Sequence, residues 1–201
     1  MQRIISGQFR GRRLADLPRT ISGVRPTGAR VRGAIFDRLQ CEIAGARVLD
    51  LFAGSGALSI EALSRGAMSA VCVESQPAVF RFLREQINAL DLQSRIVILA
   101  TDSRSFLRVN DRSVRFDLVL LDPPYGETAL LAEALCGLVE HGWLAARASI
   151  VCEFERGRRE PPMVMPRALV SESRKEYGQT VLKFLRYTEG TDEHKPPGGD
   201  A

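Results

Sequence analysis

Between residues 46 and 154, short apolar runs alternate with amphipathic segments, and this alternation restricts the possible folds more than any other feature of the sequence. The apolar runs are rich in Val, Ile and Leu and predict strands at 48–52, 70–74, 96–99, 116–121 and 150–154. Helical periodicity is found in the segments 57–65, 77–90, 103–109 and 128–140. This pattern predicts a parallel sheet that is covered by helices on both faces.

The two flanks of this region have patterns of their own. Residues 169–177 and 180–187 alternate on either side of Gly178-Gln179, which predicts an antiparallel hairpin and brings the sheet to seven strands. Residues 1–16 predict a short hairpin, and 28–40 predict a helix with Thr27 as its N-cap. We therefore expect an N-terminal hairpin and loop (1–24), an α/β domain (25–187) and a disordered polar tail (188–201).

Charge is unevenly distributed along the chain. The net charge is +4, but residues 1–40 contain nine arginines and two aspartates, a net charge of +7, so the other 161 residues sum to −3. A basic arm on a slightly acidic body indicates a polyanionic partner, and arginine favours bidentate contacts with phosphate.

Several classes of protein are disfavoured by the composition. No window has the ~20 consecutive apolar residues of a transmembrane helix, and the first residues lack the layout of a signal peptide. The four cysteines form no C-x-x-C pair, which indicates free thiols in a reducing cytoplasm and no metal site. No long heptad pattern is present, so we expect a monomer. From the transmembrane, signal-peptide and cysteine patterns above, we expect a cytoplasmic protein that does not associate with membranes.

A glycine-rich turn follows the first strand of the alternating region, in the segment Asp50-Leu51-Phe52-Ala53-Gly54-Ser55-Gly56. Ligands of doubly wound sheets bind at the carboxyl ends of the strands, where Glu74 can accept from ribose hydroxyls and Asp102 from an adenine amino group. A dinucleotide enzyme would also explain the glycines and Glu74. A carboxylate at Asp50, however, would repel a pyrophosphate but could accept from an amino-acid ammonium, which favours S-adenosylmethionine. The predicted cofactor site comprises Asp50, Phe52, Gly54, Ser55, Gly56, Glu74, Ser75, Asp102 and Ser103.

The sequence Asp122-Pro123-Pro124-Tyr125 follows the fourth predicted strand. Neither proline has an N–H group, so this loop offers carbonyl oxygens, one carboxylate and one aromatic ring. Such a set suits a planar group with an NH2. Asp122 and the Pro123 carbonyl would accept from the amine and direct its lone pair at a methyl donor, while Tyr125 stacks on the ring. We therefore predict Asp122, Pro123, Pro124 and Tyr125 as the catalytic residues.

These motifs together resemble the class I S-adenosylmethionine-dependent methyltransferases, which have a Rossmann-like fold, and D-P-P-Y resembles the subgroup that methylates planar NH2 nitrogens. The N-terminal segments Arg3-Ile4-Ile5-Ser6-Gly7, Arg10-Gly11-Arg12-Arg13-Leu14 and Arg25-Pro26-Thr27 are similar to the signature of the RsmD family. Glu61 to Ala67, Gly142-Trp143-Leu144 and Gly178-Gln179-Thr180 extend the resemblance, which covers about residues 2–187.

Membership of that family implies methylation of guanine N2 in the 16S RNA of the small ribosomal subunit. On this resemblance and on the charge pattern, the predicted RNA-binding residues are Arg10, Arg12, Arg13, Arg25, Thr27, Arg30 and Arg32. Four alternatives stay open: a DNA adenine-N6 methyltransferase, a protein glutamine-N5 methyltransferase, a catalytically silent nucleic-acid-binding relative, and a nicotinamide oxidoreductase.

Overall fold

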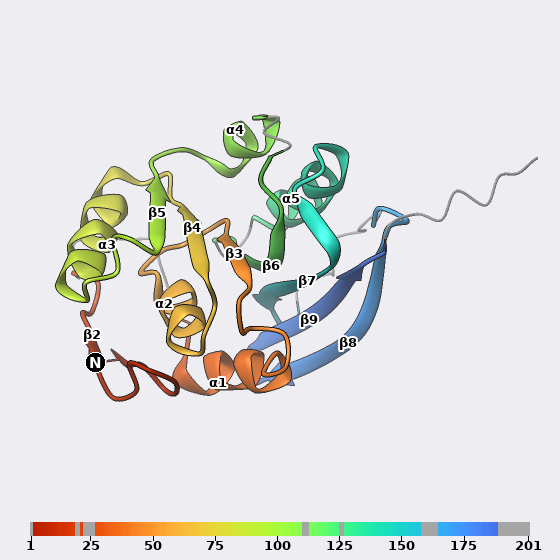
Figure 1. Cartoon of the computed structure of the whole chain (residues 1–201). Coiled ribbons are helices and arrows are strands. Elements are labelled where there is room, and N and C mark those ends of the chain that lie inside the picture. The colour runs from red at the N-terminus through yellow and green to blue at the C-terminus, as the bar shows by residue number, and fades with distance from the viewer. Residues whose placement is uncertain are drawn as a thin grey trace, which may run out of the picture.

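The protein is built on a seven-stranded sheet with the strand order β5-β4-β3-β6-β7-β9-β8 (Figure 1). The computed structural model describes residues 2–18, 21, 27–109, 113–124, 127–157 and 165–188. Five strands are parallel, namely β3 (Arg47–Asp50), β4 (Ser69–Val73), β5 (Ile96–Leu99), β6 (Phe116–Leu121) and β7 (Leu144–Glu155). The antiparallel hairpin of β8 (Leu169–Tyr177) and β9 (Thr180–Tyr187) extends the sheet beyond β7. The predicted fold class is confirmed.

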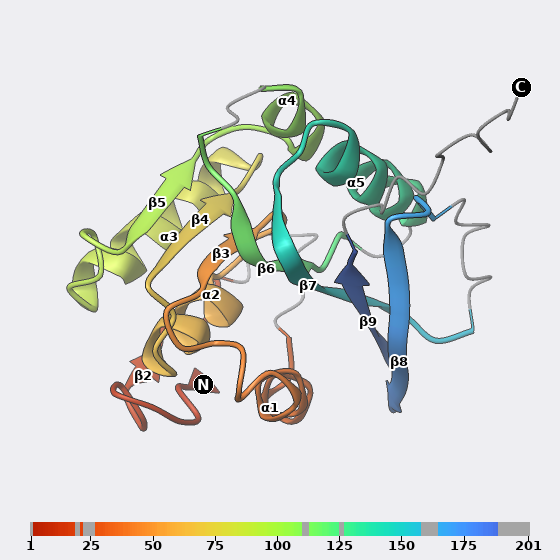
Figure 2. The same cartoon turned by 45° about the vertical axis from the view of Figure 1, so that its right-hand side comes forward.

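Helices cover both faces of the sheet (Figures 1 and 2). The helices are α1 (Ala29–Arg38), α2 (Ala57–Ser64), α3 (Pro77–Ala89), α4 (Ser103–Arg108) and α5 (Thr128–Glu140). Alternate residues of each strand point to opposite faces, so Val48 packs with α1, α2 and α3, whereas Leu49 packs with α4 and α5. The result is two hydrophobic cores, one on each side of the sheet.

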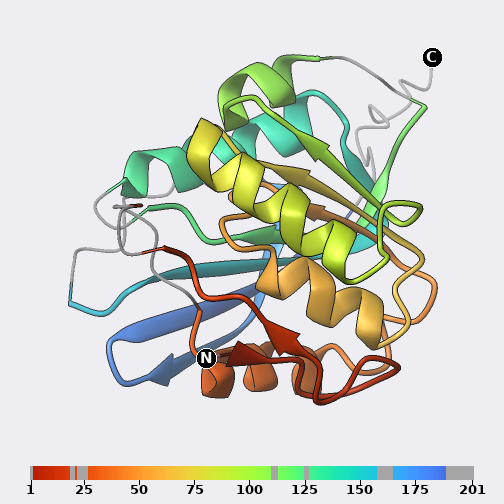
Figure 3. The same cartoon turned by 90° about the vertical axis from the view of Figure 1, so that its left-hand side faces the viewer.

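The predicted N-terminal hairpin exists and is firmly attached to the body (Figure 3). Its strands β1 (Gln2–Arg3) and β2 (Arg13–Leu14) are short and antiparallel. Ile4 is 2% exposed and lies in the same core as α1, α2 and α3. Gly7 has φ +83°, and a Cβ there would lie 1.9 Å from the Ser64 carbonyl oxygen, so only glycine allows this close approach to the end of α2.

A buried ion pair completes this attachment. Glu61 and Arg32 both have fully buried side chains, with Arg32 Nε 3.5 Å from Glu61 Oε2. The Glu61 carboxylate accepts from the backbone N–H groups of Ile5 (2.8 Å) and Ser6 (3.0 Å), and Arg32 donates to the Arg3 carbonyl oxygen (2.7 Å). The hairpin is therefore an integral part of the domain.

Two local predictions need correction. The N-cap of α1 is Gly28, with no side-chain cap, because the Thr27 hydroxyl is bonded elsewhere. Strand β7 begins at Leu144, earlier than predicted, because Leu144 pairs with Phe116 before the register shifts. Residues 145–147 do not alternate and Arg147 has φ 61°, so the sequence pattern does not predict this first part of the strand.

No helix among the described residues is long and apolar enough to cross a membrane. The tail from residue 189 onward, predicted to be disordered, lies outside the described residues.

Candidate active site

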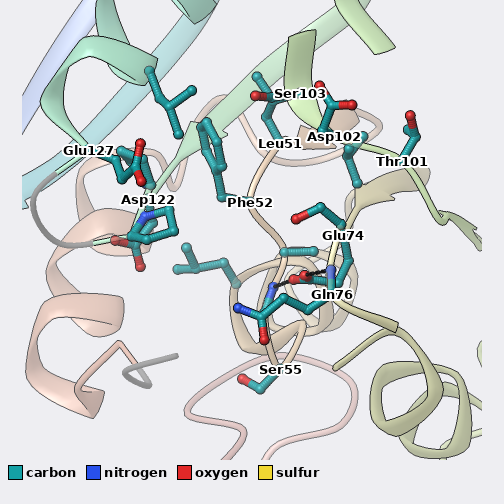
Figure 4. A pocket seen from close by; sticks show the side chains of 18 of the residues that line it. Leu51, Phe52, Ser55, Glu74, Gln76, Thr101, Asp102, Ser103, Asp122 and Glu127 are labelled. Carbon is teal, nitrogen blue, oxygen red and sulfur yellow. Dashed lines mark hydrogen bonds between the residues drawn. The ribbon is translucent and has the colours of Figure 1, made fainter. Parts of the chain in front are cut away.

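A cavity of about 320 Å³ lies at the carboxyl ends of the parallel strands (Figure 4). Its walls come from the turns that follow β3, β4, β5 and β6. Because β4 lies on one side of β3 and β6 on the other, the cavity is at the point where the strand order reverses, which is where ligands bind in doubly wound sheets. Its volume is in the range of small-molecule sites, about 300–1,000 Å³.

The glycine-rich turn forms one side of this cavity. Gly54 lines it and donates its N–H to Glu74 Oε2 at 3.0 Å, so the turn after β3 is tied to the end of β4. Gly56 is the N-cap of α2 with φ +74°, and a Cβ there would lie 2.4 Å from Leu83 Cδ1. Gly54 therefore shapes the cavity, whereas Gly56 allows α2 to pack against α3.

Glu74 and Asp102 follow neighbouring strands and both line the cavity. Glu74 Oε1 also accepts from the Gln76 N–H at 2.8 Å, as Figure 4 shows, and burial raises the pKa of this carboxyl group. Asp102 caps α4 by accepting from the Ser105 N–H and hydroxyl, bonds that lower the pKa of Asp102. Both carboxylates are thus fixed in place by hydrogen bonds.

Asp50 differs from the sequence prediction. Its side chain is 1% exposed and lies on the α2 side of β3, where the Ser59 hydroxyl donates to Oδ2 at 2.7 Å. Burial raises the pKa of Asp50 to about 7, against the opposing effect of the Ser59 hydrogen bond. The described cavity wall does not include Asp50, so the prediction of a direct contact with an ammonium group is corrected: Asp50 lies beneath the glycine-rich turn.

Asp122, Pro123 and Pro124 form the other side of the cavity, directly after β6. Thr27 is 8% exposed, lines the same side, and donates its hydroxyl to Asp122 Oδ2 at 3.0 Å. The structure thus joins two motifs that are 95 positions apart in the sequence. The predicted stacking residue Tyr125 lies outside the described residues.

The cavity is acidic. Its described wall contains four carboxylates, those of Glu74, Asp102, Asp122 and Glu127. The one cationic side chain in that wall is Arg104, which is paired with Glu133 on α5. Such a wall suits a ligand with positive charge and no phosphate.

Of the nine residues predicted for the cofactor side, Asp50 and Gly56 do not line the cavity. The other seven do, namely Phe52, Gly54, Ser55, Glu74, Ser75, Asp102 and Ser103. The sequence did not indicate the polar or charged lining residues Gln76, Thr101, Arg104 and Glu127, nor the apolar ones Leu51, Ala53, Ala57, Leu58, Val73 and Leu130. Gln76 and Thr101 lie in the loops directly after β4 and β5, a position that could have indicated them.

In the part of the chain that the structure describes, no group of His, Cys, Asp and Glu is arranged to hold a metal ion.

The predicted RNA-binding arginines are separated by the fold. Arg10, Arg12 and Arg13 are exposed on the hairpin. Arg12 donates to the carbonyl oxygens of Ala89 and Leu90 at the end of α3, and the hairpin tip lies beside the C-terminal ends of α2 and α3, opposite the cavity (Figure 3).

Two other predicted RNA-binding arginines, Arg30 and Arg32, lie on α1 and not on the hairpin. Arg32 is fully buried and is not available to a phosphate, so the prediction of an RNA contact for this residue is wrong. Arg30 is exposed in the first turn of α1, near Thr27. Arg25 lies outside the described residues.

Solved structures with the same fold indicate the class of protein. The putative methyltransferase yhhF from Escherichia coli has a TM-score of 0.82 and 34% identity, covering 92% of this chain and 97% of that chain. The putative methylase HI0767 from Haemophilus influenzae has a TM-score of 0.77 and 31% identity, covering 93% of this chain and 98% of that chain. The fold and the position of the cavity define a Rossmann-like methyltransferase.

The family is narrower than that class. The family model described as Conserved hypothetical protein 95 matches residues 2–186, and the chain belongs to this family. Ribosomal RNA small subunit methyltransferase D of Escherichia coli K12 is 41% identical over 155 residues, which are 76% of this chain and 74% of that protein. The protein of that name from Haemophilus influenzae is 36% identical over 165 residues, 82% of each chain. The RsmD-type family expected from the motifs is confirmed.

Proposed function

We propose that this protein transfers a methyl group from S-adenosylmethionine to the exocyclic N2 of a guanine in small-subunit (16S) ribosomal RNA. The observation that carries this proposal is the carboxylate of Asp122, bound by Thr27 in the same acidic cavity as Glu74 and Asp102. The names of the relatives support ribosomal RNA of the small subunit as the substrate. The choice of guanine N2 rests on the family resemblance in the sequence.

The described residues fit S-adenosylmethionine by the chemistry of the wall. This cofactor has a sulfonium, an ammonium and a carboxylate group and no phosphate, so its net charge is positive, and a wall of four carboxylates with one ion-paired arginine suits it. Glu74 would hold the ribose hydroxyls, Asp102 and Ser103 the adenine, and the backbone of Gly54 and Ser55 the amino-acid part. When bound, the cofactor supplies an electrophilic methyl group.

Asp122 would act on the acceptor amine. An exocyclic amine is a poor nucleophile because its lone pair is delocalised into the ring. Hydrogen bonds from its N–H groups to the Asp122 carboxylate and the Pro123 carbonyl would favour a pyramidal nitrogen whose lone pair is free to attack. Asp122 would also stabilise the positive charge that develops on nitrogen. The methylated nitrogen is acidic and loses its proton readily, so no strong general base is required.

A transfer assay tests this function against its alternatives. The protein is incubated with methyl-labelled S-adenosylmethionine and with small ribosomal subunits from a strain that lacks the corresponding gene. Naked 16S RNA, duplex DNA and a protein release factor are assayed in parallel, and the product nucleoside is identified by mass. We expect label in the 16S RNA as N2-methylguanosine. Label in N6-methyladenine or in protein would contradict the proposal.

Thr27 provides a second, finer prediction. Replacing Thr27 with valine keeps the shape of the side chain and removes the donor to Asp122. Hydrogen bonds to charged groups contribute about 1.5–3 kcal/mol, so we expect kcat to fall by about tenfold or more, with cofactor affinity nearly unchanged. Thr27→Ser keeps the hydroxyl and should retain most of the activity. Equal losses in both variants would show that the hydroxyl does not position Asp122.

A further inference from the structure

Arg30, three positions after the cavity residue Thr27, has its guanidinium beside an aromatic ring from the far end of the sequence. The Arg30 guanidinium carbon lies 5.9 Å from the ring centroid of Tyr177, the last residue of β8. The turn between β8 and β9 is at the carboxyl edge of the sheet, since Thr180 pairs with Glu155 at the end of β7. This turn therefore lies at the same edge as the cavity, beside the beginning of α1 (Figures 2 and 3).

Lys175 belongs to the same surface. It pairs with Leu182, whose side chain lies in the core beneath α1, so Lys175 also projects from the α1 side of the hairpin. Its neighbour Glu176 pairs with Val181 and therefore projects from the opposite face. We call the exposed surface of Arg30, Lys175 and the edge of Tyr177 the α1/β8 basic face.

The charges of this face have no counter-ion among the described residues. In the described part of the chain, no carboxylate pairs with Arg30 or Lys175. At the other end of the same helix, Arg38 is paired with Glu172 at 2.8 Å. The nearby Arg186 is also paired with Glu172 at 2.8 Å. Among the described residues of α1 and β8, exposed positive charge without a carboxylate partner is therefore found at the end nearer the cavity, at Arg30 and Lys175.

We propose that the α1/β8 basic face binds the phosphates of the RNA strand that flank the target nucleotide. The proposal rests on the proposed function, since a base that reaches Asp122 brings its own backbone to the mouth of the cavity. Thr27 contacts Asp122, and Arg30 follows it by three positions, in the first turn of α1. A planar guanidinium matches phosphate oxygens bidentately, and a ring that already orients it reduces the freedom lost on binding. The hairpin arginines, at the opposite edge, are too remote for this task.

A matched pair of variants tests the proposal. Arg84 is also exposed, and its guanidinium carbon lies 5.8 Å from the ring of Phe80, but both residues are on α3. Arg30→Ala and Arg84→Ala therefore remove the same charge from the same kind of ring contact at different places. The measurements are binding of 16S RNA fragments over a range of salt concentrations, methylation kinetics with small subunits, and S-adenosylmethionine binding.

We expect Arg30→Ala to weaken RNA binding by about five- to tenfold near 0.1 M salt and to reduce the salt slope by about one. The KM for RNA should rise, while kcat and cofactor affinity stay close to wild type. Tyr177→Leu should shift RNA affinity in the same direction by a smaller factor, and Tyr177→Phe should retain the wild-type affinity. Arg84→Ala should retain it as well.

Equal effects of Arg30→Ala and Arg84→Ala would overturn the proposal, as would an unchanged salt slope in Arg30→Ala. RNA binding is measured without turnover, so its outcome is independent of which atom is methylated. A wild-type protein that binds RNA through Arg30 but methylates another atom would overturn the proposed function and leave this inference standing.

Discussion

Replacing Asp122 with alanine should slow methyl transfer by about 100-fold or more while the affinity for S-adenosylmethionine stays nearly unchanged. The Asp122 carboxylate is held by Thr27 directly after β6, on the opposite side of the cavity from Glu74 and Asp102. It would both orient the amine and stabilise the charge that forms on nitrogen, and losing one such electrostatic contact typically costs about 100- to 1,000-fold in kcat. Single-turnover methylation of small subunits and calorimetric titration of the cofactor measure the two effects separately.

A second carboxylate, on the strand that Asp122 follows, provides the control. Asp117 lies near the amino end of β6 and accepts from the Arg47 N–H at 2.8 Å, away from the cavity. Asp117→Ala should transfer methyl groups at close to the wild-type rate. Asp122→Asn retains the shape but loses the charge, so it should stay closer to Asp122→Ala than to wild type. Full activity in Asp122→Ala would remove Asp122 from the mechanism.

The sequence was most informative where local pattern and local chemistry coincide. The apolar run at 116–121 and the proline pair after it predict β6 and the start of its loop correctly, because strand length and a missing N–H are properties of a few adjacent residues. The same holds for Gly54 and for Glu74 at the end of β4. These features determine which edge of the sheet forms the cavity.

The errors concern the direction and partners of single side chains. Asp50 was expected to face a ligand, but its alternate position on β3 turns it toward α2 and Ser59. Thr27 was expected to cap a helix, but its hydroxyl bonds to Asp122, a contact that no local pattern encodes. The burial of Arg32 is predictable from the sequence, because this residue precedes Phe36 by four positions and therefore lies on the buried stripe of α1.

That burial has a measurable consequence, because Arg32 and Glu61 are an ion pair with no exposed side-chain surface. Glu61→Gln should destabilise the protein by about 3–5 kcal/mol, the range for removing one partner of a buried pair. Glutamine is nearly the same size, but it leaves the buried Arg32 charge without its counter-ion and also removes the 2.9 Å ion pair between Glu61 and Arg65. Its amide also cannot accept from both Ile5 and Ser6, as the two carboxylate oxygens do. The loss is a large part of a typical total stability of about 5–15 kcal/mol.

Urea unfolding followed by circular dichroism measures this loss, and amide hydrogen exchange locates it. The Ile5 and Ser6 amides should exchange faster in Glu61→Gln, since the hairpin loses its attachment to α2. Glu133→Gln, which breaks the exposed pair with Arg104, should leave the unfolding midpoint nearly unchanged. Combining Glu61→Gln with Arg32→Met should cost less than the sum of the single changes, because the second removes the unpaired cation. A Glu61→Gln midpoint no lower than that of Glu133→Gln would mean that this pair does not hold the hairpin to the domain.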